Sequence, residues 1–204
     1  MSAADTGVAF GYEPPAGLGE RRIWILSGGS HRTGLLTASQ RKRLVSAVLD
    51  VQSEPQTRLV LLGVDVDGLR PAGRSALRER IGFLPSDGGL LSSLNAWENI
   101  VLPIGFHRPR SQHEVADRVY AMLAALGADA GAFLAKLPER MSPYEKKLTG
   151  YVRIALEKPD LVLAEDLQGG LDPGERDAAD RIPAAYLESC PGGTFVQLEI
   201  ASAP

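Results

Sequence analysis

The sequence predicts an α/β fold, in which short apolar strands alternate with amphipathic helices. Three observations carry this expectation. Residues 161–164 (LVLA) form a continuous apolar run of the kind that is buried on both faces of a parallel sheet. Helical patterns with capping residues lie between this run and other apolar runs, which favours a sheet covered by helices. The chain of 204 residues is also long enough to form a sizeable hydrophobic core.

The first half of the chain contains apolar runs that are separated by turn-rich sequence. Residues 14–20 (PPAGLGE) are rich in proline and glycine and precede the run IWIL. A second run, RLVLL, is closed by Gly63, and a helical stretch that begins at Pro71 leads into the run IGFLP. The expected elements are strands over residues 23–26, 58–62 and 81–85 and a helix over residues 71–80.

Two helices with N-terminal capping signals follow. Ser111 and Glu114 have the spacing of a capping box, and apolar residues then recur every three or four positions until Gly127. Ser142 and Glu145 have the same spacing before a second apolar stripe. Both segments are therefore expected to be amphipathic helices.

The last part of the chain returns to strands. The apolar run at residues 161–164 leads directly into Glu165 and Asp166. A further helix is expected from Asp172, and Pro183 should kink or end it, because proline cannot donate a helical hydrogen bond. Residues 195–200 are predicted to form the final strand.

Composition and charge exclude several classes of function. The chain has 22 Lys and Arg against 25 Asp and Glu, so its net charge is −3 and its pI is near 5.7. This balance argues against the broadly basic surface of a nucleic-acid-binding protein. The single cysteine, Cys190, cannot form an internal disulfide. Because the first residues lack signal-peptide features and no apolar run approaches the ~18 residues that span a bilayer, we expect a cytoplasmic chain that reaches membranes only through a partner.

Two stretches are candidates for chemistry. In open α/β sheets, ligands bind beyond the carboxyl ends of the strands, where Glu165 and Asp166 are expected. Adjacent carboxylates can bind Mg²⁺ and orient a water molecule, or they can cap a turn and face solvent. Residues 28–34 (GGSHRTG) follow a strand as a phosphate-binding loop would, but they lack the lysine and hydroxyl of G-x-x-x-x-G-K-[ST], which favours a plain turn.

The stretch from Leu137 to Asp172 resembles the signature region of the ATP-binding cassette (ABC) transporter ATPases. Their pattern starts a helix with L-S-G-G-Q and ends it with a basic residue and proline. Four apolar residues, Asp-Glu and a turn to Leu-Asp follow. Here MSPYE begins the helix, Lys158 and Pro159 end it, and residues 161–164 lead through ED to LD without a gap.

A second block carries the same resemblance. The run RIGFL resembles the strand before the Q-loop of that family. Residues 87–100 resemble the segment after it, most closely in ATPases of lipid-transport systems of the maintenance-of-lipid-asymmetry (MCE-associated) type. Residues 8–12 match the first strand with its adenine-stacking aromatic, Tyr12. The resemblance implies a single P-loop NTPase-like domain over residues 1–204, with a mostly parallel sheet, an N-terminal antiparallel β region and a small helical subdomain inserted at about residues 88–150.

At the positions where the family binds nucleotide, this chain departs from the family pattern. Counting without gaps places the phosphate loop on residues 35–42, where both glycines are absent and Arg41 replaces the lysine. Ser86 stands at the Q-loop glutamine and Ile200 at the switch histidine. The Walker B pair is reversed: Glu165 stands at the metal-binding aspartate, as a weak metal candidate, and Asp166 at the general base. The vestigial nucleotide-site residues are Tyr12, Thr37, Ser39, Arg41, Lys42, Ser86, Ser142 and Asp172.

These departures predict an ABC-ATPase-like subunit that has lost ATP hydrolysis and is not an enzyme. No cofactor is expected, although ATP and Mg²⁺ stay possible ligands if residual binding survives. The segment that begins at Asp87 and ends at Pro103 is closest to the family and is expected to dock an integral membrane permease of a lipid-type transport complex. A homodimer, or a heterodimer with an active ABC ATPase, is also open, and no nucleic-acid partner is expected.

Three alternatives stay open at this point. The chain could be a weakly active ATPase that uses Arg41, Glu165 and Asp166 in unusual geometry, a degenerate half-site paired with a competent ATPase, or a small α/β enzyme or ligand-binding protein that reuses the cleft. Other features favour structural roles. Tyr12 is as readily a packed aromatic as an adenine contact, and the basic pair KK at residues 146–147 is interpreted as a solvated helix face. The three histidines, His31, His107 and His113, are interpreted as surface residues.

Overall fold

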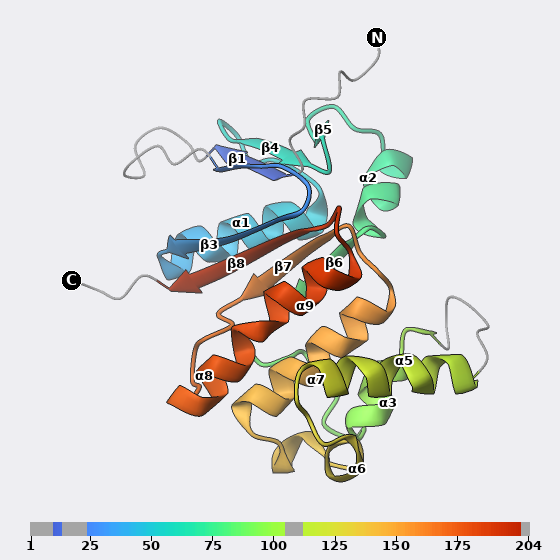
Figure 1. Ribbon diagram of the computed structural model, residues 1–204. Helices are drawn as coiled ribbons and strands as arrows, with labels where there is room; N and C mark the ends of the chain where they lie inside the picture. Colours follow the sequence, from blue (N-terminus) through green and yellow to red (C-terminus); the bar gives the residue numbers. More distant parts are fainter. Residues whose placement is uncertain (1–9, 14–23, 105–111, 201–204) are drawn as a thin grey trace.

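The computed structural model describes residues 10–13, 24–104 and 112–200 of the chain, and its strands form two four-stranded sheets (Figure 1). The first sheet is parallel, with the order β3-β8-β7-β6, and the second is antiparallel, with the order β2-β1-β4-β5. The predicted α/β class, the parallel sheet and the N-terminal antiparallel region are confirmed. The strands are β1 (Phe10–Glu13), β2 (Trp24–Leu26), β3 (Ser30–Leu36), β4 (Arg58–Leu61), β5 (Val64–Asp65), β6 (Ile81–Leu84), β7 (Leu161–Glu165) and β8 (Thr194–Ile200).

Most helices between β6 and β7 gather at one end of the molecule, at the bottom of Figure 1, away from the antiparallel sheet. These are α3 (Ala96–Val101), α5 (Gln112–Ala125), α6 (Ala130–Phe133), the short 3-10 helix η1 (Pro138–Arg140) and α7 (Pro143–Leu156). The remaining helices are α1 (Ala38–Asp50), α2 (Pro71–Arg78), α8 (Pro173–Ala179) and α9 (Arg181–Ser189). The part of the chain described contains no helix that is both long and apolar enough to cross a bilayer.

Strand β7 is buried on both faces, as its apolar run predicts. Leu161 and Leu163 belong to a core cluster that includes α1 and the antiparallel strands. Val162 and Ala164 belong to a second cluster, which includes residues of α7 and α9. All four side chains are completely buried. Because full burial of an aliphatic side chain contributes roughly 1.5–3 kcal/mol, this strand fixes the centre of the fold.

The capping signals in the sequence are correct where the structure describes them. Ser142 caps α7, and its box with Glu145 is complete in both directions. Gly127 lies just beyond α5 with φ +73°, a backbone conformation that favours glycine. Ser111, the predicted cap of α5, His107 and residues 14–20 lie outside the described residues.

Pro183 interrupts the helix that starts after Asp172, as predicted, but the break precedes the proline. Helix α8 ends at Ala179, Asp180 separates the two helices, and Pro183 lies in the first turn of α9. The position follows from the chemistry of proline. Its missing N–H leaves the carbonyl four residues earlier without a partner, so the ladder fails on the N-terminal side of the ring.

Candidate functional site

The carboxyl ends of β3, β7 and β8 meet at one edge of the parallel sheet. Glu165 ends β7 opposite Leu198 of β8, and Ile200 ends β8 opposite Leu36 of β3. Helix α1 begins directly after β3, so its first turn lies at the same edge. This is the edge at which open α/β sheets bind ligands.

A single residue, Thr37, connects β3 to α1. The Thr37 hydroxyl accepts a hydrogen bond from the Gln40 backbone N–H at 3.3 Å, and the Gln40 side chain accepts one from the Thr37 N–H at 3.0 Å. The Thr37 hydroxyl also lies 3.2 Å from that of Ser39. The segment aligned with the phosphate loop is therefore the end of a strand and the start of a capped helix. Side chains of the chain itself satisfy part of the helix N-terminus to which phosphate binds in P-loop proteins.

The side chain of Arg41 reaches from α1 to both Walker B candidates. Its Nε lies 3.3 Å from Oε1 of Glu165, and its Nη1 lies 3.8 Å from Oδ2 of Asp166. The Arg41 side chain is 13% exposed. Both of these nitrogens are buried and lack hydrogen-bond partners among the described residues. The guanidinium is therefore held by the charge of the two carboxylates rather than by aligned hydrogen bonds.

The backbone at Asp166 is constrained. Asp166 has φ +50°, which non-glycine residues seldom adopt, and its N–H donates to the Leu198 carbonyl at 2.8 Å. A Cβ atom on Gly169 would lie 2.2 Å from the Asp166 carboxylate. The carboxylate is thus packed against the backbone of its own turn, and only glycine fits beside it.

Glu199 is a third carboxylate at this edge, and the sequence analysis did not identify it. It accepts hydrogen bonds from Nε2 of Gln197 at 2.8 Å and from the N–H of Gln168 at 3.2 Å. Burial raises the pKa of Glu199, and the neighbouring Asp166 carboxyl raises it further, whereas these two hydrogen bonds oppose the rise. The resemblance to the ABC ATPases places the switch histidine position on the next residue, Ile200, and assigns no role to Glu199. The available signal was one acidic residue in the otherwise uncharged strand TFVQLEI.

Lys147 is buried, so the interpretation of the basic pair at residues 146–147 as a solvated helix face is wrong for this residue. The residue is only 3% exposed, and its Nζ donates to the carbonyls of Ser86 and Asp166, each at 2.7 Å. Burial lowers the pKa of Lys147, and the negative charges of Asp166, Glu199 and Asp87 oppose that effect. The prediction was wrong because α7 packs over the β6–α3 connection, which the sequence pattern does not reveal.

Several predicted nucleotide-site residues serve local structure. The Ser142 hydroxyl caps α7 by accepting a hydrogen bond from the backbone N–H of Glu145 at 3.2 Å. The Asp172 carboxylate caps α8 in the same way, by accepting one from the N–H of Glu175 at 2.8 Å. Tyr12 is 7% exposed and packs in the core cluster that contains α1, so it has no open ring face on which a base could stack. Lys42 and Ser39 lie on the exposed side of α1. Of the predicted residues, the structure brings Arg41, Glu165 and Asp166 together, with Ser86 joined to them through Lys147.

The remaining sequence expectations can be placed in the same way. Within the described ranges, no group of three or more His, Cys, Asp or Glu side chains is arranged to hold a metal ion, and Glu165 pairs with Arg41. Residues 28–29 form a turn before β3, as the gap-free count predicts. His31 and His113 are exposed, and Nε2 of His31 lies 3.3 Å from Oε1 of Gln197.

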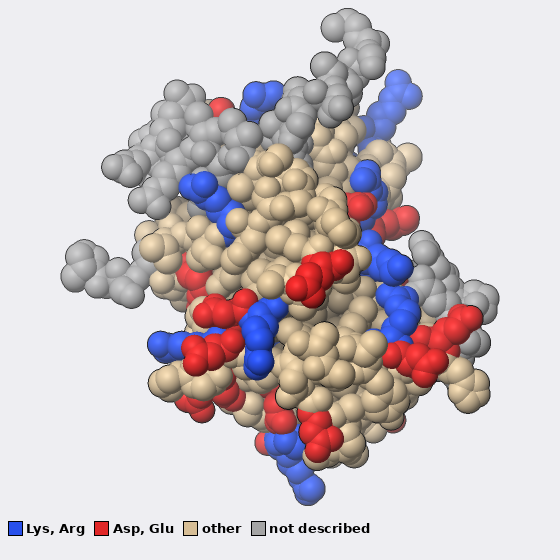
Figure 2. All heavy atoms as spheres, viewed as in Figure 1, with Lys and Arg blue, Asp and Glu red and all other residues tan. Residues whose placement is uncertain are grey.

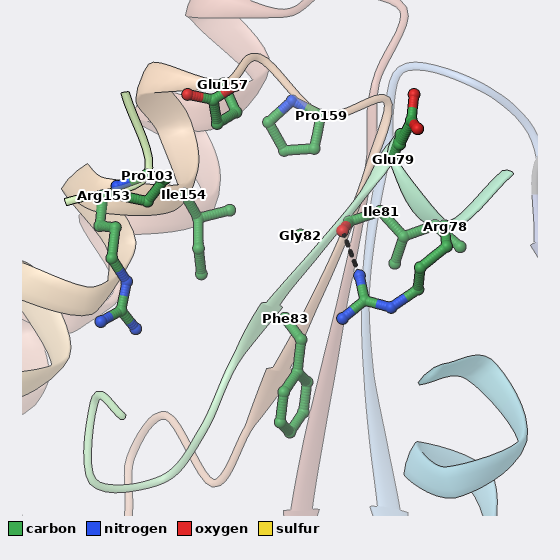
Figure 3. Close-up of a pocket in the computed structure, with 10 residues that line it drawn as sticks. All are labelled: Arg78, Glu79, Ile81, Gly82, Phe83, Pro103, Arg153, Ile154, Glu157 and Pro159. Carbon is green, nitrogen blue, oxygen red and sulfur yellow. Dashed lines mark hydrogen bonds between the residues drawn. The ribbon is translucent and has the colours of Figure 1, made fainter. Parts of the chain in front are cut away.

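A groove of about 580 Å³ runs along the outer edge of β6 (Figure 3). Arg153 and Ile154 of α7 lie on one side of it, Arg78 on the other, and Phe83 between them. The Arg78 guanidinium donates to the Ile81 carbonyl at 3.0 Å. Positive and negative side chains are interspersed over the face shown in Figure 2. The groove wall combines apolar side chains, which include Pro103 and Pro159, with the positive charges of Arg78 and Arg153 and the negative charges of Glu79 and Glu157.

Comparison of sequences finds similarity to ATP-binding subunits of transport systems. It is 33% identical over 135 residues to the lipoprotein-releasing system ATP-binding protein LolD of Roseobacter denitrificans, which covers 65% of this chain and 57% of that protein. It is 31% identical over 116 residues to the methionine import ATP-binding protein MetN 2 of Pseudomonas aeruginosa (57% and 34%). It is 28% identical over 115 residues to the probable ribonucleotide transport ATP-binding protein mkl of Mycobacterium tuberculosis (56% and 32%). The matches thus span between a third and somewhat over half of the relatives' lengths.

Comparison of structures agrees on the fold. The chain superposes on cbiO1 of Clostridium perfringens, part of the ABC transporter complex cbiONQ, with a TM-score of 0.73 and 16% identity over 96% of this chain and 79% of that one. The ATP-binding cassette MJ0796, in a dimeric post-hydrolysis state bound to ADP and phosphate, gives a TM-score of 0.68 and 18% identity over 95% and 85%. No protein-family model matches the chain.

Proposed function

We propose that this chain, a homologue of ABC transporter ATP-binding subunits with the fold of their ATPase domains, is a transport-complex subunit that does not hydrolyse ATP. The observation that carries the proposal is the position of Arg41. Its guanidinium lies against the two carboxylates at the end of β7, where the family arrangement calls for a metal ion and an attacking water. A fixed cation there competes with Mg²⁺ for the same oxygen atoms.

The surroundings of Arg41 do not fit a magnesium nucleotide. Magnesium requires oxygen ligands in near-octahedral geometry, and both carboxylates already face the guanidinium. A phosphate group requires a nest of free backbone N–H groups, whereas the first turn of α1 is closed by the box between Thr37 and Gln40. The site therefore offers neither of the two arrangements on which phosphoryl transfer depends, free oxygen ligands for a metal ion and a phosphate cradle.

The groove beside β6 supports the expectation of a permease partner. It lies next to the segment that begins at Asp87, and Pro103 at the end of that segment lines it. Its exposed floor is provided by Phe83, a half-buried aromatic residue. A groove with an apolar floor and charged rims is suited to an amphipathic helix or loop of a membrane protein. The similarity to a lipoprotein-releasing ATP-binding protein favours a lipid-type complex.

A heterodimer with an active ATPase is a second candidate, favoured by one observation. Leu35 and Ile200, at the ends of the paired strands β3 and β8, are 55% and 43% exposed. Large apolar side chains at this edge flank the Arg41 cluster and would be covered by a second subunit. In that complex this chain would supply surface, and the partner would supply the catalytic residues.

Calorimetric titration with Mg-ATP and with ADP tests the first proposal. We expect no binding tighter than ~100 μM, which corresponds to about −5.5 kcal/mol, and no phosphate release. Tighter binding would refute the loss of the nucleotide site, and turnover that disappears in Asp166→Asn would refute the loss of hydrolysis. The partner is tested separately by affinity purification from solubilised membranes. A polytopic membrane protein should be recovered by the natural chain and by Tyr120→Asp, but not by Phe83→Asp in the groove.

A further inference from the structure

One face of α7 holds the connection that follows β6. Lys147, Gly150 and Arg153 are spaced three residues apart, so they line a single side of the helix. The Lys147 ammonium donates to the Ser86 carbonyl at 2.7 Å. The Arg153 guanidinium donates to the carbonyls of Gly88 and Gly89, at 2.9 and 2.7 Å. Three carbonyls of the connection are therefore bound by cations of one helix.

Between these two cations the backbones are in direct contact. A Cβ atom on Gly150 would lie 2.5 Å from the Gly88 carbonyl oxygen, and one on Gly88 would lie 2.2 Å from the Lys146 carbonyl oxygen. Gly88 also has φ +79°. No larger side chain fits between helix and connection, so the two cannot slide past each other without losing this contact.

Lys147 extends the same contact to the Arg41 cluster. Its ammonium donates a second hydrogen bond, at 2.7 Å, to the Asp166 carbonyl in the turn after β7. That carbonyl also accepts the N–H of Gly169 at 3.1 Å, which closes the turn. Lys147 is only 3% exposed as a residue, and a buried ammonium is costly unless polar atoms replace water; here two carbonyls from separate segments do so.

We propose that Lys147 is a clamp that makes α7, the connection at residues 86–89 and the turn at residues 166–169 move as one body. The connection and the turn are joined by β6 and β7, which pair in register only as far as Leu84 and Ala164, and the clamp continues the link beyond the strands. Because Arg153 lines the groove, a change at the groove wall is transmitted through α7 to the backbone that carries Asp166. These contacts involve neither nucleotide nor permease, so the clamp does not depend on the proposed function.

Amide hydrogen exchange of the full chain tests the clamp. In Lys147→Met, which keeps the aliphatic stem but cannot donate, the amides of Gly88 and Gly169 should exchange at least ~10-fold faster, equivalent to about 1.4 kcal/mol of local opening. Lys146→Met is the matched control and should leave both rates unchanged. The amide of Thr194, which donates to the Asp160 carbonyl at the opposite end of β7 and β8, should not respond in either variant.

Three results of the exchange experiment would contradict the clamp. Unchanged exchange in Lys147→Met, faster exchange at only one of the two amides, or equal acceleration at Thr194 would overturn the clamp. If Lys147→Met does not fold, Lys147→Gln keeps an N–H donor with a shorter reach, and it should accelerate both amides to a smaller extent. Transmission is tested by Arg153→Met, which should speed exchange at Gly169 in the natural background and add nothing in Lys147→Met. Additive effects of the two substitutions would refute the link.

Discussion

Two buried cations approach the end of β7, and they are held in opposite ways. Arg41 lies against carboxylates, yet its Nε and Nη1 make no hydrogen bond among the described residues. Lys147 makes two short hydrogen bonds to backbone carbonyls, and within the described part of the chain it forms no ion pair. The difference teaches that the Arg41 contact depends on charge and belongs to the site, whereas the Lys147 contact depends on geometry and belongs to the scaffold.

The largest expected effect is the loss of stability when Lys147 is replaced, and it tests whether the two cations differ in role. Lys147→Met removes the Lys147 donor of the Ser86 carbonyl, at about 1–3 kcal/mol for an unsatisfied group, and one of two hydrogen bonds to the Asp166 carbonyl, at about 1 kcal/mol. The free energy of unfolding should therefore fall by ~2–4 kcal/mol. Arg41→Met removes a guanidinium whose Nε and Nη1 make no hydrogen bond to the residues that the structure describes, and the carboxylates that it leaves are 21% and 24% exposed to water, so it should cost only ~1–2 kcal/mol. Urea unfolding of both variants measures the two values. Equal losses would mean that the two cations have the same role.

The next prediction compares two glycine substitutions to measure the cost of disturbing the close contact between α7 and residue 88. Gly88 and Gly68 both have φ +79°, but a Cβ on Gly68 would meet nothing within 4 Å. Gly68→Ala should therefore lose only the ~1 kcal/mol of an unfavourable backbone angle. Gly88→Ala adds the clash with the Lys146 carbonyl and should lose ~2–3 kcal/mol. Thermal unfolding of the pair gives the difference, and similar midpoints would show that the connection can move away from α7.

The smallest effect concerns protonation of Glu199, which lies beside Asp166. The pKa of Glu199 is raised in the folded chain, so between its ordinary value and the raised value the folded state binds more protons than the unfolded state. The contribution of Glu199 to folding stability is therefore complete below its ordinary pKa, and it is lost as the pH rises through the raised pKa of the folded chain. Glu199→Gln should therefore gain stability over the natural chain at pH 7, by less than ~1 kcal/mol, and the gain should vanish near pH 4. A constant difference across this range would contradict the assignment.

The fold followed from local signals in the sequence, and the site followed only in part. The capping box at Ser142 and the apolar run at residues 161–164 are complete within a few residues, so their structures could be predicted. The meeting of Arg41 with Glu165 required alignment to a family, because α1 and β7 are distant in sequence. The burial of Lys147 depends on which face of α7 is covered, and that is decided by tertiary packing.

The burial of Tyr12 could not be predicted from the sequence either. An aromatic residue in a first strand can face either the ligand or the core, and the alternation of side chains along a strand does not say which face is covered. The antiparallel sheet packs against α1, so the ring of Tyr12 is enclosed. Burial raises the pKa of its hydroxyl, and the charge of Glu54 adds to that rise.

The single-residue connection at Thr37 also determines how hard it would be to build a standard phosphate loop into this chain. Exchanging Arg41 for lysine would change the cation but leave the first turn of α1 wound and capped. A working phosphate loop at residues 35–42 would require that turn to be unwound, with Thr37 and Gln40 replaced together and glycines introduced on either side. Each of these steps alone lowers helix stability without creating a binding site. A conversion of this kind therefore has no favourable first step, because the capped first turn of α1 is locally stable as it stands.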